Sequence, residues 1–593
     1  MAGVPHYSVD LERGAAIEQY GPMGPKVDFW PHLSECSKAR QPTPLKRMYN
    51  YSAIPGMISM AGGLPAPEYF PFDSISAEAL KPEAFQTSVS GNSSSNGLFT
   101  WLRKLFGVSP ETSHMEIPKY TSDPTDPSAF QLSVALQYGT SRGLLSLRTF
   151  VQAFTTSVFR PLNPETTTLL HVGNTDGWDK IAETLCNPGE FILTEEWTYP
   201  AAIIAAWPHH VRPFGIPMDG QGMRADSLEG ILANWVPEDR GAPRPHVMYT
   251  IPIGQNPSGA TMGVERKKAI YAVCVKYDVI IVEDDPYYFL QMSEYTPAAL
   301  RPSSPSKAHL SEAEEQKEFI ESLIPTYLKF DYQGRVVRLD TFSKTIAPGS
   351  RLGWFTCNPL FAERLERAQE STVQGPSGFS QALVGKLVVD HWKYSGYIRW
   401  LQGLRAQYTL RRDAIIDALA EAFDLEEEWT RDGGFAPLKG SVRVYIARSK
   451  CGSKQTLGSG EKKGKILFSF VPPTAGMFLW LKVHLYNHLA YSPDAPPPKS
   501  VEDTLENKLW VELVNHKVLF VPGWMFSSSP TLESATEQPL LDVSPSVHID
   551  DRYKAISEGG KYGHFRTSYS TPSPAEIIRG DEAIRNRDGE KLP

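Results

Sequence analysis

A regular alternation of apolar runs and helix-like segments between residues 166 and 356 constrains the fold of this chain more than any other feature. The apolar runs are short, nearly continuous, and rich in β-branched and aromatic residues, which is typical of strands buried on both faces of a sheet. Segments such as GWDKIAETLCN and VERKKAIYAVCVKY lie between them and have the length of helices. We therefore predict an α/β fold with a mostly parallel sheet that helices cover on both faces. The strand candidates are TTLLHVG, EFILTEE, HVMYTIPI, DVIIVEDD, RVVRLDTFS and GWFTCN.

The pattern changes after this region. The stretch 398–423 carries apolar residues at helical spacing with charges between them, which predicts one long helix. The shorter strand candidates MFLWLKV, KVLFVPG and HFRTSYS follow, and they indicate a smaller α+β domain. A chain of 593 residues is too long for a single core. The predicted parts are an extended N-terminal arm (1–60), a loop and helices that join the small domain to the large domain (61–150), the large domain with the mostly parallel sheet (151–397), and the long connecting helix with a small C-terminal domain (398–593).

Composition and charge argue against several classes of protein. The net charge is -8, from 59 basic and 67 acidic residues, so neither a nucleic-acid partner nor an anionic membrane partner is expected. No apolar run reaches the length of a membrane span, and the first residues lack a secretory signal, which predicts a cytoplasmic protein. The five cysteines are far apart, which argues against a disulfide framework or a zinc site. Polar stretches predicted as surface loops are 86–97, 296–318, 448–465, 491–500 and 527–560.

Polar residues follow several of the predicted strands at the point where each strand ends. Lys344 follows RVVRLDTFS, Asp284 ends DVIIVED, and Asn256 follows HVMYTIPI. In open α/β sheets, ligands bind beyond the carboxyl ends of the strands. The pair Asp284 and Asp285 suggests a metal site, but no nearby histidine or further carboxylate completes a ligand set. We therefore expect no metal, a ligand role for Asp284 and a structural role for Asp285.

These residue types match the needs of pyridoxal phosphate. This cofactor requires a lysine that condenses with its aldehyde, and a carboxylate that keeps the ring nitrogen protonated so that the ring accepts electrons. Lys344 and Asp284 meet these two needs. The phosphate requires cationic and hydroxyl donors and suits the N-terminus of a helix. The further donors would be Tyr287 and Asn256 at the phenolic oxygen, and Thr341, Ser343, Arg351 and the backbone of residues 173–178 at the phosphate.

The motifs also carry a family resemblance. The chain resembles the fold-type I pyridoxal-phosphate aminotransferases of the class I/II group. It is most similar to the branch that holds aromatic-amino-acid and kynurenine/2-aminoadipate aminotransferases, and specifically to the fungal aromatic aminotransferases. The matching strings occur in family order from about residue 42 to about residue 570; they are AGGLPAPEYFPF, LQYGTSRGLLSLR, GNTDGWDK, TEEWTYP, IPIGQNPSGATM, VEDDPYYFLQ, TFSKTIAPGSRLGW, PTAGMFLWLK and FRTSYS.

The resemblance implies a cofactor role for each matching residue. Lys344 would form the covalent link with pyridoxal 5'-phosphate, Asp284 would pair with its ring nitrogen, and Tyr199 would stack on the ring face. Members of this branch often carry small hydroxyl or glutamine side chains in the phosphate loop where this chain has Asn174 and Thr175, although backbone contacts should survive this difference. The remaining implied contacts are Tyr287 and Asn256 at the phenolic oxygen, and Asn174, Thr175, Thr341, Ser343 and Arg351 at the phosphate.

The resemblance also implies how substrates bind. Arg566 would hold the substrate α-carboxylate as a bidentate pair, with Asn256 near it and Gly63 beside the substrate. Tyr138 would reach the phosphate of a neighbouring subunit, which implies a homodimer with shared active sites. The substrates would be an amino acid and a 2-oxo acid.

The implied activity is a ping-pong transamination from an aromatic amino acid, kynurenine or 2-aminoadipate to a 2-oxo acid such as 2-oxoglutarate, with Lys344 as the base at the substrate Cα. Other fold-type I enzymes, such as lyases or synthases, use the same cofactor site and remain an alternative. An aminotransferase-like regulator is a second alternative, but the Pro-rich first sixty residues are unsuited to the helix-turn-helix domain that it needs.

Overall fold

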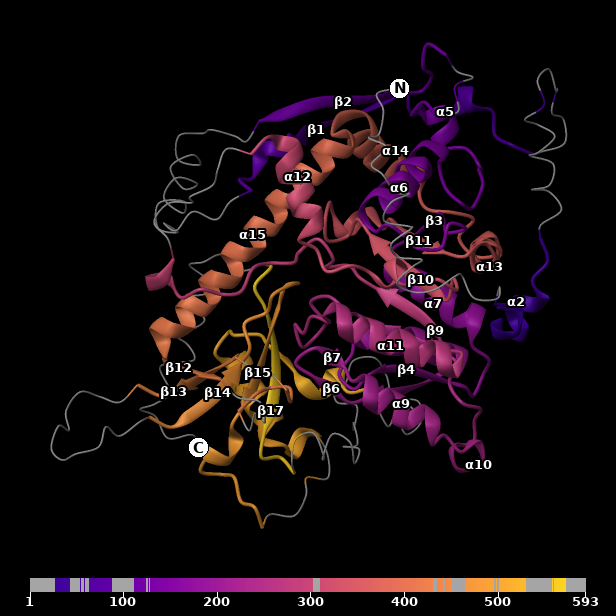
Figure 1. Ribbon diagram of the computed structural model, residues 1–593. Coiled ribbons are helices and arrows are strands. Elements are labelled where there is room, and N and C mark those ends of the chain that lie inside the picture. Colours follow the sequence, from indigo (N-terminus) through magenta and orange to yellow (C-terminus); the bar gives the residue numbers. More distant parts are fainter. Residues whose placement is uncertain are drawn as a thin grey trace.

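A seven-stranded sheet forms the centre of the computed structural model (Figure 1). Its strand order is β3-β11-β10-β9-β8-β4-β5. Strand β11 runs antiparallel to both of its neighbours, and all other neighbours pair in parallel. Every residue of β8, β9, β10 and β11 is buried, so the predicted mostly parallel and doubly covered sheet is confirmed. The strands are β3 (Thr167–His171), β4 (Phe191–Glu195), β5 (Arg212–Ile216), β8 (Val247–Thr250), β9 (Ile280–Asp284), β10 (Val336–Thr341) and β11 (Gly353–Cys357).

Two hydrophobic cores lie on opposite faces of this sheet, because successive residues of a strand point to opposite sides. In β3, Leu169 packs in the same core as Trp178 of α7, while Leu170 packs in the core that contains Phe154 of α6. Helices therefore cover both faces, as predicted. The helices of this part of the chain are α5 (Leu132–Ala135), α6 (Leu145–Val158), α7 (Asn174–Leu185), α8 (Pro200–Ala206), α9 (Ala225–Ala233), α10 (Pro237–Arg240), α11 (Val264–Tyr277), α12 (Glu312–Glu321), α13 (Pro359–Glu370) and α14 (Gly378–Gly385).

A long helix, α15 (Lys393–Ala422), runs diagonally in Figure 1 from the upper part of the molecule to a second sheet. It begins at Lys393 rather than at residue 398, where the sequence pattern predicts its start. The second sheet has six strands in the order β12-β13-β14-β15-β17-β16, and each neighbouring pair is antiparallel. Its elements are β12 (Asp424–Trp429), β13 (Arg443–Arg448), β14 (Ile466–Phe470), β15 (Phe478–Val483), β16 (Val521–Pro522) and β17 (Gly563–Ser568), with α16 (Leu505–Asn515) before β16.

Several elements differ from the sequence prediction. The part of the N-terminal arm in residues 27–42 is not extended: it contains a 3-10 turn (Trp30–His32) and α2 (Glu35–Ala39). The Ser34 N–H there donates to the Thr184 carbonyl of α7 at 2.9 Å, which fixes this segment on the large sheet's helical layer. The sequence KVLFVPG yields only the two-residue strand β16. The predicted loop 296–318 ends in a helix, α12, because Ser311 and Glu314 form a capping box at its start.

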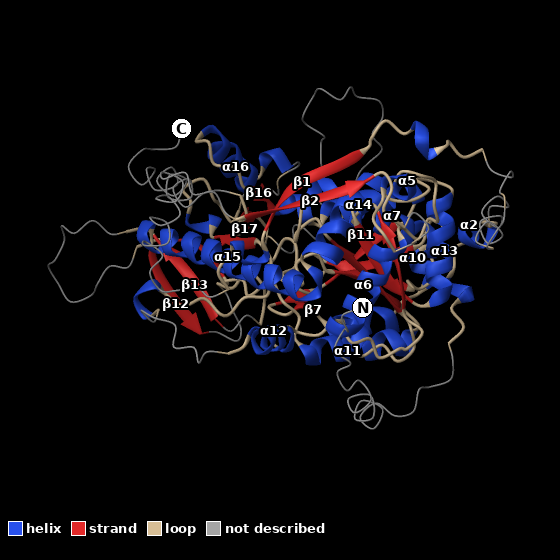
Figure 2. Cartoon of the chain, turned by 90° about the horizontal axis from the view of Figure 1, so that it is seen from above, coloured by secondary structure: helices blue, strands red, loops and turns tan. Residues whose placement is uncertain are grey.

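A two-stranded ribbon of β1 (Ser74–Leu80) and β2 (Thr112–Pro118) was not predicted. It lies beside α14 in Figures 1 and 2. The indole N–H of Trp392, at the start of α15, donates to the Leu80 carbonyl at 3.0 Å and holds the ribbon there. A further short pair, β6 (Met218–Asp219) and β7 (Gly222–Met223), follows β5.

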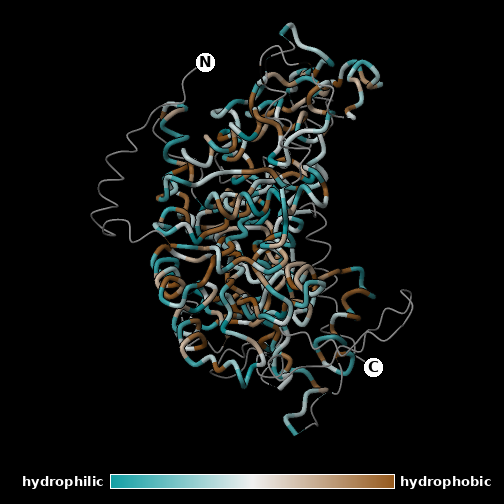
Figure 3. Tube along the Cα trace, turned by 90° about the vertical axis from the view of Figure 1, so that its right-hand side faces the viewer, coloured by the Kyte–Doolittle hydropathy of each residue, from teal (hydrophilic) through white to brown (hydrophobic). Residues whose placement is uncertain are grey.

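Hydrophobic segments run through the interior of the molecule in the hydropathy-coloured trace (Figure 3). Within the described residues, no helix combines the length and the apolar character that are needed to cross a membrane. The cytoplasmic location and the predicted domain boundaries stay predictions. Much of the predicted loops lies outside the described residues, which are 27–42, 54, 58, 63–87, 111–123, 126, 128–301, 310–429, 435–440, 443–450, 464–494, 498, 501–528, 557 and 559–571.

Candidate active site

The carboxyl edge of the large sheet brings Lys344 and Asp284 together. Asp284 is the last residue of β9, and it pairs in register with Leu339 of β10, so that Lys344 follows a few residues later at the same edge. Lys344 is half-buried. Burial lowers the pKa of its amine, the positive charges of Arg351 and Arg566 lower it further, and the negative charge of Asp284 opposes them. All three charged groups therefore lie within electrostatic reach of the Lys344 amine. The sequence motifs predict this for Asp284 and Arg351, and the family resemblance implies it for Arg566.

Asp284 is buried and accepts two hydrogen bonds. The Tyr249 hydroxyl donates to Oδ2 at 2.6 Å, and the Asn174 amide donates to Oδ1 at 2.6 Å. Burial raises the pKa of Asp284, while these two hydrogen bonds and the nearby positive charges of Arg338 and Lys344 lower it. Hydrogen bonds to a carboxylate favour its charged form. Asp284 is thus a desolvated carboxylate whose two oxygens are both held in place.

The turn after β10 forms a cationic cradle. The Thr341 hydroxyl donates to Ser343 Oγ at 2.9 Å, and Arg351 Nη1 donates to the same Oγ at 3.2 Å. The Arg351 guanidinium lies against Gly173, at the start of α7, so closely that a Cβ on this glycine would clash with Nη2. Thr175 is exposed in the first turn of α7. The first N–H groups of a helix lack intrahelical partners, so the cradle offers backbone donors, hydroxyls and a guanidinium, which suit a phosphate.

Asn174 differs from its predicted role. Its side chain does not point to the cradle, because its amide nitrogen donates to Asp284 and also to the Leu339 carbonyl, at 3.3 Å. The amide oxygen is buried and has no hydrogen-bond partner among the described residues. Of the predicted phosphate contact, only the backbone N–H of Asn174 remains.

Arg566 reaches the large sheet from the small one. It lies in β17, and its Nη1 donates to Oδ1 of Asn256 at 2.8 Å. The guanidinium also lies 4.4 Å from the ring centre of Phe478 and 4.9 Å from that of Phe526. Burial lowers the pKa of Arg566, and its Nε is buried without a hydrogen-bond partner in the described part of the chain. A half-buried guanidinium with an unused donor is suited to bind a carboxylate.

Two close backbone contacts allow the sheets to meet at this point. Gly254 has a φ of +57°, and a Cβ on it would lie 2.6 Å from the backbone nitrogen of Gly476. Next to Tyr199, the Thr198 N–H donates to the Phe526 carbonyl at 2.9 Å, in the short turn Gly523–Phe526. The chain segments that carry Asn256 and Tyr199 are therefore fixed directly against the small sheet.

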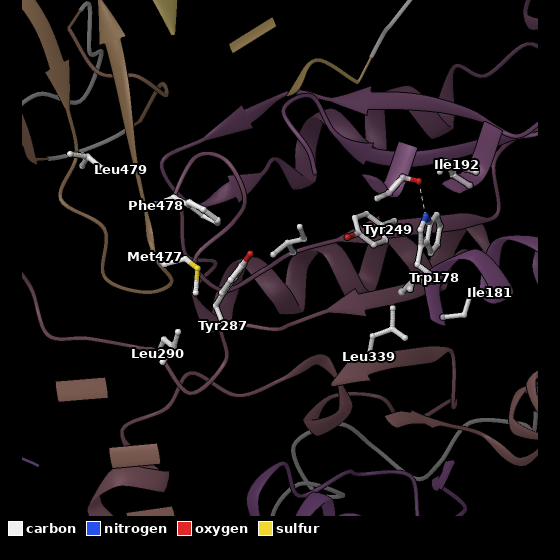
Figure 4. Close-up of a cluster of buried hydrophobic side chains, with 14 of the residues drawn as sticks. Trp178, Ile181, Ile192, Tyr249, Tyr287, Leu290, Leu339, Met477, Phe478 and Leu479 are labelled. Atoms are coloured by element: carbon white, nitrogen blue, oxygen red, sulfur yellow. Dashed lines mark hydrogen bonds between the residues drawn. The ribbon is translucent and has the colours of Figure 1, made fainter. Parts of the chain in front are cut away.

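Aromatic residues complete the site. Tyr287 is buried, and its ring lies 5.6 Å from that of Phe478 in an edge-on arrangement (Figure 4). Burial raises the pKa of the Tyr287 hydroxyl, the charge of Asp284 raises it further, and Tyr199 has a smaller effect of the same sign. Tyr199 directly precedes α8 and packs at the edge of the same core. Tyr287 thus lies within electrostatic reach of both Asp284 and Tyr199.

Two predicted residues lie elsewhere. Tyr138 is 61% exposed and lines a surface groove of about 940 Å³. Phe72 and Phe379 line the same groove. Gly63 is exposed, and no described residue lies within 4 Å of a Cβ built on it. The predicted contacts of Tyr138 with a neighbouring subunit and of Gly63 with substrate stay predictions.

Asp285 points away from the site into a buried charge cluster. Arg338 forms ion pairs with Asp285 at 3.0 Å, with Glu283 at 3.1 Å and with Asp340 at 2.8 Å, and all four side chains are buried. We call these four residues the Arg338 cluster. Asp285 therefore has the structural role that the sequence predicts, and it does not share a ligand with Asp284. Among the described residues, no three His, Cys, Asp or Glu side chains gather in a way that could hold a metal ion.

Sequence reasoning missed two buried residues of the large sheet, Tyr249 and Glu195. In the sequence, Tyr249 has the pattern of a core tyrosine within a strand, and no neighbouring residue indicates that its hydroxyl binds Asp284. Glu195 ends β4 and is fully buried, where its Oε1 accepts from the Thr250 hydroxyl at 2.6 Å. Its place at the carboxyl end of a buried strand is a signal that could have identified it, because a carboxylate there faces the ligand edge of the sheet.

Comparisons with known proteins agree with this geometry. A family model described as aminotransferase class I and II matches residues 124–444. An aromatic amino acid aminotransferase of Schizosaccharomyces pombe is 35% identical over 505 residues, which are 85% of this chain and 91% of the relative. An L-tyrosine:2-oxoglutarate aminotransferase of Serpula lacrymans is 30% identical over 542 residues, or 90% of this chain and 89% of the relative. The crystal structure of aminotransferase Aro8 from Candida albicans is 29% identical, with a TM-score of 0.69 over 96% of this chain and 100% of that one. The resemblance predicted from the sequence is confirmed.

Proposed function

Because the chain belongs to the class I and II aminotransferase family, we propose that it transfers the amino group of an aromatic amino acid to a 2-oxo acid such as 2-oxoglutarate, with pyridoxal 5'-phosphate at the site around Lys344. The observation that carries the proposal is the placement of the Lys344 amine within reach of Asp284, Arg351 and Arg566. An amine, a carboxylate and two guanidinium groups match an aldehyde, a ring nitrogen, a phosphate and a substrate carboxylate. The relatives that are named for aromatic amino acids and for tyrosine support the substrate class.

The residues present fit this cofactor. Asp284 would pair with the ring nitrogen, and the Arg351 cradle with the N-terminus of α7 would hold the phosphate. Tyr287 and Asn256 would contact the phenolic oxygen, and Tyr199 would cover one ring face. When bound, pyridoxal phosphate supplies an electron-withdrawing ring that accepts the electron pair left when a proton leaves the substrate Cα.

Lys344 acts as the base. Its pKa is lowered by burial and by the two guanidinium groups, so a larger fraction of its amine is neutral near pH 7 than for an exposed lysine. The neutral Nζ takes the proton from the substrate Cα and returns a proton to the carbon that receives the amino group. One water molecule supplies the carbonyl oxygen when the donor leaves as a 2-oxo acid. The second 2-oxo acid then takes up the amino group by the same steps in reverse, and one water molecule is released.

Arg566 orients the substrate. The hydrogen bond to Asn256 fixes the plane of its guanidinium, and an amino acid carboxylate would bind the planar guanidinium in a bidentate manner. The rings of Phe478 and Phe526 keep this region apolar. A bound carboxylate directs the Cα–H bond toward Lys344, whose pKa is lowered by the nearby charge of Arg566.

A second copy of the chain would complete the site. The groove lined by Tyr138, Phe72 and Phe379 exposes aromatic surface, which is typical of a protein interface. In the proposed homodimer, Tyr138 of one subunit donates to the cofactor phosphate of the other. A mixing experiment tests this: Lys344→Ala subunits combined with Tyr138→Phe subunits should regain activity, because each hybrid dimer has one site with both residues intact. Mixtures without any regain of activity would contradict shared sites.

The main experiment compares Lys344→Ala with Lys268→Ala, a lysine on α11 that pairs with Glu265. The first variant should lose the visible absorbance of the lysine-bound cofactor and all transamination, and the second should keep both. Activity is measured as glutamate formed from 2-oxoglutarate with phenylalanine, tyrosine, tryptophan, kynurenine or 2-aminoadipate as donor. Full activity of Lys344→Ala would reject the proposal.

The same donor panel separates the alternatives. A lyase or synthase on this fold would consume the amino acid without forming an equimolar amount of glutamate. A regulator of transcription would bind specific DNA and show no turnover. Equimolar 2-oxo acid and glutamate are the expected products.

A further inference from the structure

Both oxygens of the Asp284 carboxylate are already bound by side chains of this chain. Tyr249 donates to one and Asn174 to the other, each at 2.6 Å, and the two donors come from different elements, β8 and the start of α7. A carboxylate has about four lone-pair positions, so each oxygen can still accept one further hydrogen bond. Two donors from two directions fix the plane of the carboxylate and leave it able to accept a third donor.

Tyr249 is held rigidly in this position. It is buried, and its ring lies 4.7 Å from that of Trp178 (Figure 4). The indole N–H of Trp178 donates to the Ala202 carbonyl of α8 at 2.7 Å. The helix α8 begins directly after Tyr199. A continuous series of contacts therefore runs from α8 through Trp178 and Tyr249 to Asp284.

Asn174 is held by two acceptors. Its amide nitrogen has two hydrogens, and the acceptors are Asp284 Oδ1 and the Leu339 carbonyl. No amide hydrogen is left for a phosphate. The position at the start of α7, which favours a phosphate role by sequence, therefore leaves only the backbone N–H for that purpose.

We propose that Asn174 and Tyr249 are positioning residues for Asp284, and that the Asn174 side chain acts on the ring-nitrogen end of the ligand and not on its phosphate. The inference rests on the proposed function, because it needs Asp284 to bind the ring. A desolvated carboxylate that is free to rotate would pair poorly with a ring N–H, whereas one held on both oxygens is already oriented. Neither residue touches the reacting atoms.

The test compares two ligands on the cofactor-free protein: pyridoxal 5'-phosphate and pyridoxal, which lacks the phosphate. Asn174→Ala and Tyr249→Phe should each weaken both ligands by a similar factor, about tenfold or more, since each variant removes a hydrogen bond to a charged group. Arg351→Ala is the matched comparison, and it should weaken the phosphorylated ligand far more than pyridoxal. Binding is followed by the absorbance of the ligand at fixed pH.

A second measurement separates positioning from a general effect on folding. In an Asp284→Ala background, the further change Tyr249→Phe should cause no additional loss of affinity, because the hydroxyl then has no carboxylate to orient. An additive loss would overturn the inference, as would an Asn174→Ala variant that weakens only the phosphorylated ligand. If Asp284→Ala and Lys344→Ala bind both ligands like the parent protein, the proposed function itself fails; if they lose binding while Asn174→Ala and Tyr249→Phe do not, only this inference fails.

Discussion

Glu195 should make the stability of this protein depend on pH near neutrality. Its carboxyl group is fully buried at the end of β4, Oε1 accepts from the Thr250 hydroxyl and from the Ile251 N–H, and Oε2 is buried without a hydrogen-bond partner among the described residues. Burial raises the pKa of Glu195 from 4.5 to about 7; the hydrogen bonds lower it and the charge of Asp284 raises it further. A Glu195→Gln variant keeps the shape of the side chain and removes the titration.

The sign of the effect follows from the raised pKa. Between pH 4.5 and about 7 the folded protein binds a proton at Glu195 that the unfolded chain does not bind. The stabilisation is therefore fully present below pH 4.5 and is lost as the pH rises through the folded pKa. The free energy of unfolding falls by up to about 1.4 kcal/mol per pH unit, or roughly 3 kcal/mol across the window.

Thermal unfolding of the cofactor-free protein measures this effect. An unfolding entropy of about 2 cal/mol/K per residue converts roughly 3 kcal/mol into a change of about 2–3 °C in Tm for a chain of this length. We expect the Tm of the parent minus the Tm of Glu195→Gln to decrease by this amount from pH 5 to pH 8. Glu238→Gln, at an exposed position of α10, is the control variant. If the Tm of the parent minus the Tm of Glu195→Gln stays constant or grows with pH, Glu195 does not have the raised pKa from which this prediction follows.

Three further changes test other parts of the structure. Gly173→Ala should raise the dissociation constant of pyridoxal 5'-phosphate at least about tenfold, because its φ of +95° strains an alanine and the new Cβ displaces Arg351; unchanged binding in an absorbance titration would contradict this. Arg338→Met should destabilise the protein by about 3–5 kcal/mol, because it leaves the buried carboxylates of Asp285 and Asp340 without their ion-pair partner, and a Tm equal to that of the parent would show that they do not need the guanidinium. His564 is buried, and burial lowers its pKa to about 3, so its contribution to stability is present above pH 6.5 and is lost as the pH falls. The amount by which the Tm of His564→Gln lies below that of the parent should therefore shrink from pH 7 to pH 5. A Tm deficit that widens over this range would contradict the prediction.

The sequence pattern was sufficient for the central strands of the large sheet because they are buried on both faces. Their apolar runs are short and continuous, which is typical of strands buried on both faces of a sheet. The strand β5 was not predicted, because its sequence, RPFGI, contains Pro and Gly. These residues are tolerated at the edge position that β5 occupies. The strand β12 reads DLEEEW, and its three glutamates also reflect an edge strand with exposed residues. Edge strands are not required to be apolar, so the apolar pattern identified the edge strand β3 but not β5 or β12.

Only some residues of the candidate site could be predicted from the sequence pattern. Lys344 and Asp284 were accessible because the carboxyl ends of parallel strands meet at one edge of a sheet. Arg566 came only from the family resemblance, because it enters from the small sheet and no local pattern gives the packing of two sheets. The partners of Asp284 were not accessible: the direction of the Asn174 amide and the target of the Tyr249 hydroxyl depend on side-chain geometry across three elements.

The environment of Arg566 has a consequence for the choice of ligand. Its guanidinium has lost much of its hydration before any substrate arrives, since two phenyl rings lie against it and its Nε has no partner among the described residues. Coulomb attraction strengthens as the local dielectric constant falls, from about 80 in water to about 20 near a protein surface. An α-carboxylate at this position would therefore be attracted strongly by the guanidinium, whereas an aromatic amine of the same shape but without an acid group would have no such attraction. If Arg566 binds the substrate carboxylate as proposed, this half-buried cation would favour amino acids over the corresponding amines that lack a carboxyl group.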